Sequence, residues 1–265
     1  MKIIKGNQTY NLQDLGIIIN SYIITSPNPI HEREKIDDRD GFIDLGTTYD
    51  GRVITVKLTI LPVDRHDFAL LRNKVFRILD SRESFYLVHE EEGKRWTVKY
   101  NSPFSFSRVE NIGETTIELI SSSAYAESVG TTLDELTFES EKWQVGQGLI
   151  SDDLSYIHST PTFSIYNAGD IMVDPRQYNL KITLKGISTG LQIINHTTGD
   201  TYAYNGVLNE GDTLVLDGVR TLKNGDSDFK NTNKKLLTIA PGWNEFEVTG
   251  VTDFEIKFDF RFYYI

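Results

Sequence analysis

Five histidines and a large surplus of acidic side chains are the residues of this sequence best suited to acid–base or metal chemistry. The histidines are His31, His66, His89, His158 and His196. No two of them stand in His-x-x-x-His or His-Glu-x-x-His spacing, so the signatures of zinc hydrolases are absent. None has a matched catalytic partner, and we interpret all five as surface residues. The chain has no cysteine, which excludes disulfides, thiolate nucleophiles and zinc–thiolate sites.

An acidic cluster, Asp37-Asp38-Arg39-Asp40-Gly41, resembles a calcium-binding loop at first sight. An EF-hand loop alternates its ligands and ends with a glutamate at its twelfth position. Here Arg39 interrupts the alternation, and the twelfth residue is Thr48. We therefore interpret the cluster as an acidic turn beside a strand.

Carboxylate pairs for glycoside hydrolysis can be drawn in many ways from 38 acidic residues, and no pair stands out from the others. A phosphate-binding loop of the Gly-x-x-x-x-Gly-Lys-Ser/Thr type is also absent. We expect no catalytic residue, no cofactor and no metal site, and hence no enzyme. A polysaccharide-degrading enzyme is kept as a third hypothesis, behind a structural protein and a carbohydrate-binding module.

Aromatic side chains offer a different chemistry, because an exposed ring can stack against the apolar face of a sugar. Trp243, Tyr202 and Tyr204 are the candidates for sugar stacking, and Trp143 is a further one. The alternative for each of them is packing in the core, where aromatic side chains are mostly found.

Strands are the main elements that the N-terminal half predicts. Residues 53–60 alternate, and residues 115–120 form another run of the same kind. One helix is predicted after Asp64 or Asp67, either of which can cap its first turn. Its apolar stripe recurs at spacings of three and four. The stripe consists of Phe68, Leu71, Val75, Ile78 and Leu79.

Residues 85–88 and 95–100 predict a β-hairpin with a charged tip. Such a tip can reach basic groups on a neighbouring copy or on a partner protein. The predicted contact residues are Glu90, Glu91, Glu92 and Lys94. The alternative is a solvated turn. At the start of the tip, Glu90 is expected to raise the pKa of His89.

The C-terminal half predicts strands and turns alone. Residues 128–160 are rich in Ser, Thr, Gly and acids, and we place a domain boundary near their start, giving domains 1–130 and 131–265. Trp143 is expected to be packed, so we do not treat this segment as a free linker. Beyond Pro161, Asn-Gly and Gly-Asp pairs separate short strands, which is typical of a sandwich or jelly roll. The last strand is predicted to be central, because one face carries Phe254, Ile256, Phe258, Phe260 and Phe262.

Composition limits the functions that remain. The net charge of -11 makes sequence-specific nucleic-acid binding a poor hypothesis, since that affinity comes from cations on phosphates. No run approaches the ~20 apolar residues of a membrane helix. No signal peptide is recognised, so we expect synthesis in a bacterial cytoplasm without a membrane partner.

Two stretches carry a resemblance to a known family. The first contains Arg39-Asp40-Gly41, Leu45-Gly46, Tyr49, the strand at 52–60, the helix and the hairpin. It resembles the ring-forming domain of the distal tail protein (Dit) family of siphophages, a β-sandwich that carries one helix and a β-hairpin. The second resembles the galectin-like or carbohydrate-module-like jelly roll of the family. It contains Phe163 to Asp170, Asp174-Pro175, Asn195 to Gly199, Asn209 to Leu214, Pro241 to Asn244 and the final aromatic strand.

The resemblance implies a mainly β structural protein of the virion tail tip. Its copies would form a hexameric ring, single or double, through which DNA passes. The implied partners are the tail tube protein, the baseplate hub or tail-associated lysin, and a receptor-binding protein. The alternative is a carbohydrate-binding adhesion module of a phage tip, with a cell-wall glycan as its ligand.

Overall fold

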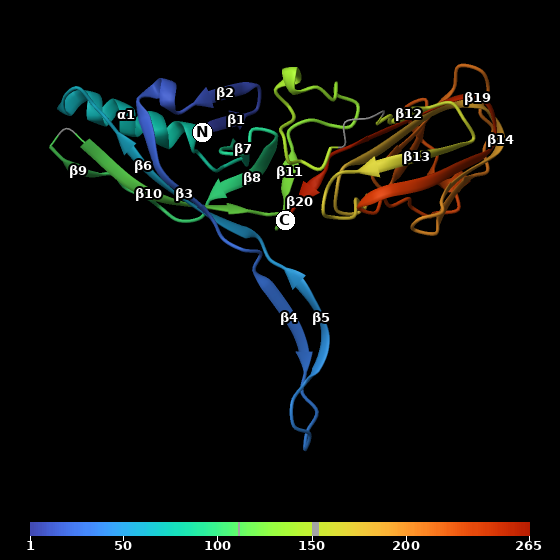
Figure 1. The fold of residues 1–265 in the computed structure, drawn as a ribbon, viewed down its shortest axis with the longest axis horizontal. Helices are drawn as coiled ribbons and strands as arrows, with labels where there is room; N and C mark the ends of the chain where they lie inside the picture. Colours follow the sequence, from blue (N-terminus) through green and yellow to red (C-terminus); the bar gives the residue numbers. More distant parts are fainter. Residues whose placement is uncertain (111, 150–153) are drawn as a thin grey trace. The chain divides into compact units, whose positions relative to one another are not determined.

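The computed structural model describes residues 1–110, 112–149 and 154–265, which divide into two compact units. Unit 1 comprises Met1–Ala126 together with Ile265, and unit 2 comprises Glu127–Tyr264. Both consist mainly of antiparallel strands, and one α-helix is present in the described residues, so the predicted mainly β class is confirmed (Figure 1). No helix in these ranges is both long and apolar enough to cross a membrane.

Unit 1 contains ten strands, one α-helix and a short 3-10 helix in its described part. In chain order these are β1 (Lys2–Lys5), β2 (Gln8–Asn11), η1 (Gln13–Leu15), β3 (Ile17–Ile24), β4 (Pro29–Glu34), β5 (Ile43–Tyr49), β6 (Arg52–Ile60), α1 (Arg65–Ile78), β7 (Phe85–Val88), β8 (Lys94–Tyr100), β9 (Ser107–Val109) and β10 (Ile112–Ser121). The main sheet has the order β2-β1-β7-β8-β10-β6-β3, while β4 and β5 form a separate two-stranded sheet.

The core of unit 1 follows from alternation along the strands. In β6, residues Ile54, Val56, Leu58 and Ile60 are buried, and they lie beside the buried face of β10. Helix α1 begins as predicted, because the Asp64 carboxylate accepts the backbone N–H groups of the first turn. Its stripe packs into the same core through Phe68, Val75, Ile78 and Leu79. The predicted hairpin is also confirmed, as β7 and β8.

Unit 2 is built from strands and short 3-10 helices. They are β11 (Ala126–Ser128, which spans the division between the units), η2 (Phe138–Ser140), β12 (Ile157–His158), β13 (Thr162–Asn167), β14 (Leu180–Asn195), β15 (Asp200–Tyr204), β16 (Thr213–Asp217), β17 (Arg220–Lys223), β18 (Asp226–Ser227), η3 (Phe229–Asn231), β19 (Gly242–Phe260) and β20 (Tyr263–Tyr264). Trp143 is buried, as expected.

Two long, bent strands organise unit 2, where the sequence had indicated several short ones. β14 pairs with β16 through its first half and with β15 through its second half, and β19 runs beside it over both halves. Register shifts interrupt the β14–β19 pairing in the middle. There the two backbones approach so closely that a Cβ on Gly250 would lie 2.1 Å from the carbonyl oxygen of Gly190. Gly250 therefore permits the bend.

The final aromatic run is buried on one face, as predicted. Phe254, Ile256, Phe258, Phe260 and Phe262 are at most 8% exposed. β19 lies between β12 or β13 on one side and β14 on the other, so it is a central strand.

Candidate functional site

The longest exposed ribbon in the described part of unit 1 is formed by β4 and β5, and we call it the arm (residues 29–49). The arm projects from the main sheet of unit 1 (Figure 1). Every residue of β4 is exposed, and in β5 only Ile43 is partly covered. Pairing runs from Pro29 opposite Tyr49 to Glu34 opposite Ile43, with one bulge. The arm is thus regular backbone without a core of its own.

Large apolar side chains lie along this uncovered ribbon. Their exposed fractions are 47% for Ile30, 42% for Ile36, 56% for Phe42, 57% for Leu45 and 49% for Tyr49. A lone two-stranded ribbon is at best marginally stable in water, and clustered exposed apolar groups mark interaction sites. The arm therefore has the properties of a segment that a partner covers.

The arm also has more acidic than basic side chains. One of its cations, the Arg33 guanidinium, lies 4.8 Å from the centre of the Phe42 ring. At the tip, Asp38 has a φ of 60° and the Arg39 N–H donates to the Ile36 carbonyl, so the Asp-Asp-Arg-Asp cluster is a turn. The charged residues are Glu32, Glu34, Asp37, Asp38, Asp40 and Asp44 against Arg33, Lys35 and Arg39.

Arg52 fixes the root of the arm. Its Nε donates to the Thr25 carbonyl at 2.7 Å, and its Nη1 donates to the Ala124 carbonyl at 3.2 Å. The guanidinium also lies 5.2 Å from the centre of the Trp96 ring. Burial lowers the pKa of Arg52 from its ordinary value, and Tyr22 opposes this shift. The root is therefore rigid, while the ribbon beyond it is uncovered.

A second exposed apolar surface lies beside α1, and we call it the α1 groove. Phe76, Tyr100, Pro103 and Phe104 line a hollow of about 320 Å³. The Phe76 and Phe104 rings meet edge to face at 5.3 Å. Helix α1 has a basic surplus, with Arg65, Arg72, Lys74 and Arg77 against Asp67. The groove is thus aromatic beside a cationic helix, in a chain that is acidic as a whole.

The predicted contact tip between β7 and β8 is compact. The Lys94 Nζ lies 2.6 Å from Glu91 Oε1, and the Glu91 N–H donates to the His89 carbonyl. Glu90 and Glu92 are exposed, while Gly93 is buried. The expected rise in the pKa of His89 was wrong. Burial and the N-terminal ammonium lower that pKa, and they outweigh Glu90. The contact role of Glu90, Glu91, Glu92 and Lys94 stays a prediction.

The four aromatic candidates for sugar stacking separate clearly, and Trp143 is excluded because it is only 4% exposed. Trp243 is 49% exposed, whereas Tyr202 and Tyr204 are 2% and 1% exposed. The Tyr202 hydroxyl shares a hydrogen bond with Thr221, and the Tyr204 hydroxyl donates to Asp228. Burial raises the pKa of Tyr202 to about 12. The stacking hypothesis is therefore wrong for both tyrosines, which are core residues, and it remains for Trp243.

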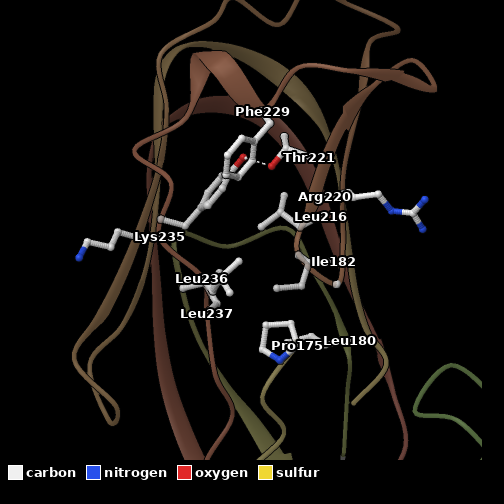
Figure 2. A pocket seen from close by; sticks show the side chains of 12 residues that line it. Pro175, Leu180, Ile182, Leu216, Arg220, Thr221, Phe229, Lys235, Leu236 and Leu237 are labelled. Atoms are coloured by element: carbon white, nitrogen blue, oxygen red, sulfur yellow. Dashed lines mark hydrogen bonds between the residues drawn. The ribbon is translucent and has the colours of Figure 1, made fainter. Parts of the chain in front are cut away.

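A small cavity beside Tyr202 is too narrow for a sugar. Leu180, Ile182, Leu216 and Phe229 point into it, and the hydrogen bond to Thr221 lies at its upper end (Figure 2). Its volume is about 10 Å³. This is about the space that one water molecule needs. The cavity is a packing gap of the sandwich.

One motif escaped notice in the sequence. Residues 186–190 read Gly-Ile-Ser-Thr-Gly, which matches the Gly-x-Ser-x-Gly pattern of a hydrolase elbow. An elbow presents its serine on a strand-to-helix turn, but Ser188 lies inside β14 and is 2% exposed. Its Oγ donates to the Gly250 carbonyl at 2.6 Å. Ser188 therefore fixes the bend of the long strands and is no nucleophile.

Comparison with known proteins identifies the class of unit 1. Residues 5–121 match the family model of the phage tail protein RIFT-related domain. Unit 1 is therefore similar to a phage tail protein domain over nearly its whole length. None of the curated proteins has a sequence that matches this chain.

The fold of the whole chain is similar to that of the SPP1 Dit protein, described as a paradigm of the hub adsorption apparatus in phages infecting Gram-positive bacteria. The TM-score is 0.72 at 11% identity, and 98% of each chain is covered. Two chains of the phage p2 baseplate in its activated conformation, with Sr and with Ca, give TM-scores of 0.48 and 0.49. They are 9% and 10% identical, and the similarity covers 97% of this chain and 96% of theirs. The SPP1 Dit match confirms the resemblance to the siphophage distal tail family for the fold, and the domain match over residues 5–121 agrees with it.

Proposed function

We propose that this chain is a structural protein of a siphophage tail tip, where its copies form a hexameric ring. The ring joins the tail tube to the baseplate hub and leaves a bore for DNA. The arm carries this proposal, because it exposes five large apolar side chains on a ribbon without a third strand in its sheet. Such a surface is stabilised when another protein covers it.

A second copy of this chain is the partner that its own charges favour. The arm has a surplus of carboxylates, and α1 has a surplus of cations beside an aromatic groove. Strands of six or seven residues carry the arm tip about 20 Å from its root. We therefore assign the α1 groove of the next copy as the binding site of the arm.

A contact between an arm and a different surface of the next copy is heterologous. Repeating a heterologous contact gives a closed ring when the rotation closes, and a filament when it does not. Six copies are the ring order that the distal tail family implies. The acidic surplus of the chain suits a bore for DNA, because carboxylates repel phosphates and reduce adhesion.

The remaining partners are those that the resemblance to the distal tail family implies. Residues 1–130 form the ring and contact the tail tube protein, and the opposite side holds the baseplate hub or tail-associated lysin. Residues 131–265 form a separate module that can hold a receptor-binding protein. The Glu90–Lys94 tip is a second contact between copies, weaker than the arm because its Lys94 charge is already paired within the tip.

Disulfide cross-linking tests the ring and its contact together. The chain has no cysteine, so Leu45→Cys combined with Phe76→Cys gives a single pair. Under oxidation we expect a ladder of covalent multimers ending at the ring, with a hexamer mass for the uncrosslinked wild type in native mass spectrometry. The matched control is Val219→Cys with Phe76→Cys, since Val219 is 51% exposed in unit 2. A monomeric mass at every concentration, together with absence from purified tails, would refute the ring.

A second experiment separates the two contacts. Phe42→Ser with Leu45→Ser removes apolar groups from the arm, and Glu90→Gln with Glu92→Gln neutralises the tip without a change of shape. We expect the arm variant to remain monomeric and the tip variant to form rings with weakened affinity. The assignment to the arm is wrong if the arm variant still forms rings that negative-stain images cannot distinguish from wild type.

A further inference from the structure

Trp243 differs from the other two tryptophans of the chain. Trp96 and Trp143 are 6% and 4% exposed, but Trp243 is 49% exposed. The cause is the phase of β19, in which Asn244 and Phe246 point inward and are buried, so that Trp243, Glu245 and Glu247 point outward. A half-exposed indole on a regular strand is a large apolar surface in water, and it needs an explanation.

Hydrogen bonds hold the backbone on both sides of Trp243 in place. The Asn244 side chain accepts from the Ala240 N–H and donates to the Ala240 carbonyl, both at 2.8 Å. This pair of bonds closes the turn that leads through Gly242 into β19. The indole is therefore presented by a rigid element, and little ordering entropy opposes binding to it.

A second ring and several polar groups surround the indole. Tyr166 lies opposite Trp243 on β13, and the two rings are 5.0 Å apart and tilted by 53°. One step along the strands, the Ser164 hydroxyl donates to the Glu245 carboxylate at 3.1 Å. One step further, the Glu247 carboxylate lies 2.8 Å from His196 Nε2. We call this set the Trp243 corner.

We propose that the Trp243 corner binds neutral pyranose residues of a glycan. A pyranose ring has an apolar C–H face that suits an exposed indole, and hydroxyls at its rim that suit carboxylate acceptors. The aromatic pair stands among polar side chains, whereas a protein-binding centre is apolar with a polar rim. Glu245 and Glu247 repel anionic sugars and phosphates, so neutral glycans are the expected class. This site is independent of the arm and of ring formation.

A glycan array tests the proposal with full-length protein. The probes are neutral oligosaccharides of glucose, galactose and N-acetylglucosamine, with oligogalacturonate as the anionic comparison. We expect binding to at least one neutral glycan and none to oligogalacturonate. Trp243→Ala should weaken that binding about tenfold or more. Tyr166→Ala and Glu245→Gln should weaken it less.

Two further variants keep the result interpretable. Trp243→Phe keeps a smaller ring and should retain part of the affinity, which guards against a variant that fails to fold. Val219→Ala, at an exposed apolar residue outside the corner, should bind as wild type does. Absence of binding to every neutral glycan, or equal binding by wild type and folded Trp243→Ala, would overturn the proposal. Loss of another tail protein from Trp243→Ala particles without glycan binding would also overturn it, because the corner would then be a protein-docking site.

Discussion

The two hairpins of unit 1 share a motif and differ in their surroundings. The β7–β8 hairpin lies inside the main sheet, between β1 and β10, and its facing residues Leu87 and Trp96 are buried. The arm forms a two-stranded sheet of its own, and its apolar residues are exposed. The sequence suggested a contact role for the first hairpin, yet the second has the surface that requires a partner. The difference shows that the role of a hairpin depends more on whether the rest of the chain covers it than on its turn.

Amide hydrogen exchange should give the largest contrast between the two hairpins. In the unassembled chain we expect the strands at 85–88 and 94–100 to exchange only through global unfolding, which costs about 5–15 kcal/mol in an ordinary domain. Residues 29–49 should exchange with almost no protection and become protected on ring formation. Mass-spectrometric exchange on both forms checks this. Equal protection of the two hairpins in the unassembled chain would remove the basis of the comparison.

A matched pair of leucine truncations should give the next largest effect. Leu87 is 0% exposed in β7, and Leu45 is 57% exposed in the arm. Leu87→Ala should lower the free energy of unfolding by about 2–5 kcal/mol, because it leaves a cavity. Leu45→Ala should change it by less than about 0.5 kcal/mol and weaken ring formation instead. Urea titration and native mass spectrometry of both variants measure the two effects. A large loss of stability in Leu45→Ala would mean that the arm has a cover within its own chain.

The parts of the fold that the sequence predicted are those with one buried face. Helix α1 was predictable because its stripe packs on the core and Asp64 caps its start. The final strand was predictable because its phenylalanines alternate with charged residues. In both cases burial of one side requires apolar residues to recur at a fixed spacing along the sequence.

Such a pattern is weaker in the arm and in the long strands. In the arm, β4 shows no alternation, whereas Ile43, Leu45 and Tyr49 of β5 alternate with Asp44, Gly46 and Thr48, a signal that was not used. In β14, Gly186 and Gly190 resemble strand breaks, although they mark a bend within one strand. The exposure of Trp243 had a signal that was not used. Asn244, Phe246 and Val248 share the buried phase, which places Trp243 on the opposite face.

Two matched ion pairs should show a smaller difference, this time in coupling energy between the β7–β8 tip and an exposed turn of unit 2. Glu91 and Lys94 in the β7–β8 tip, and Asp217 and Arg220 in unit 2, both pair at a spacing of three residues. The Lys94 side chain is 16% exposed, whereas that of Arg220 is 70% exposed. Double-mutant cycles should give about 0.2–1 kcal/mol for the Lys94 pair and nearly zero for the Arg220 pair. A larger coupling for the exposed pair would contradict the view that the tip belongs to the folded body.

His89 should give the smallest effect, as a dependence of stability on pH. Burial and the N-terminal ammonium lower the pKa of His89 in the folded chain, and Glu90 only partly opposes them. The unfolded chain then binds the proton more readily, so this contribution is present above about pH 6.5 and is lost as the pH falls through the lowered pKa. The unfolding temperature of His89→Gln should therefore fall less than that of wild type between neutral and mildly acidic pH. His66→Gln, in the exposed first turn of α1, is the control and should follow wild type. If His89→Gln is as sensitive to acid as wild type, the tip is solvated like the arm and the two hairpins are more alike than their exposure indicates.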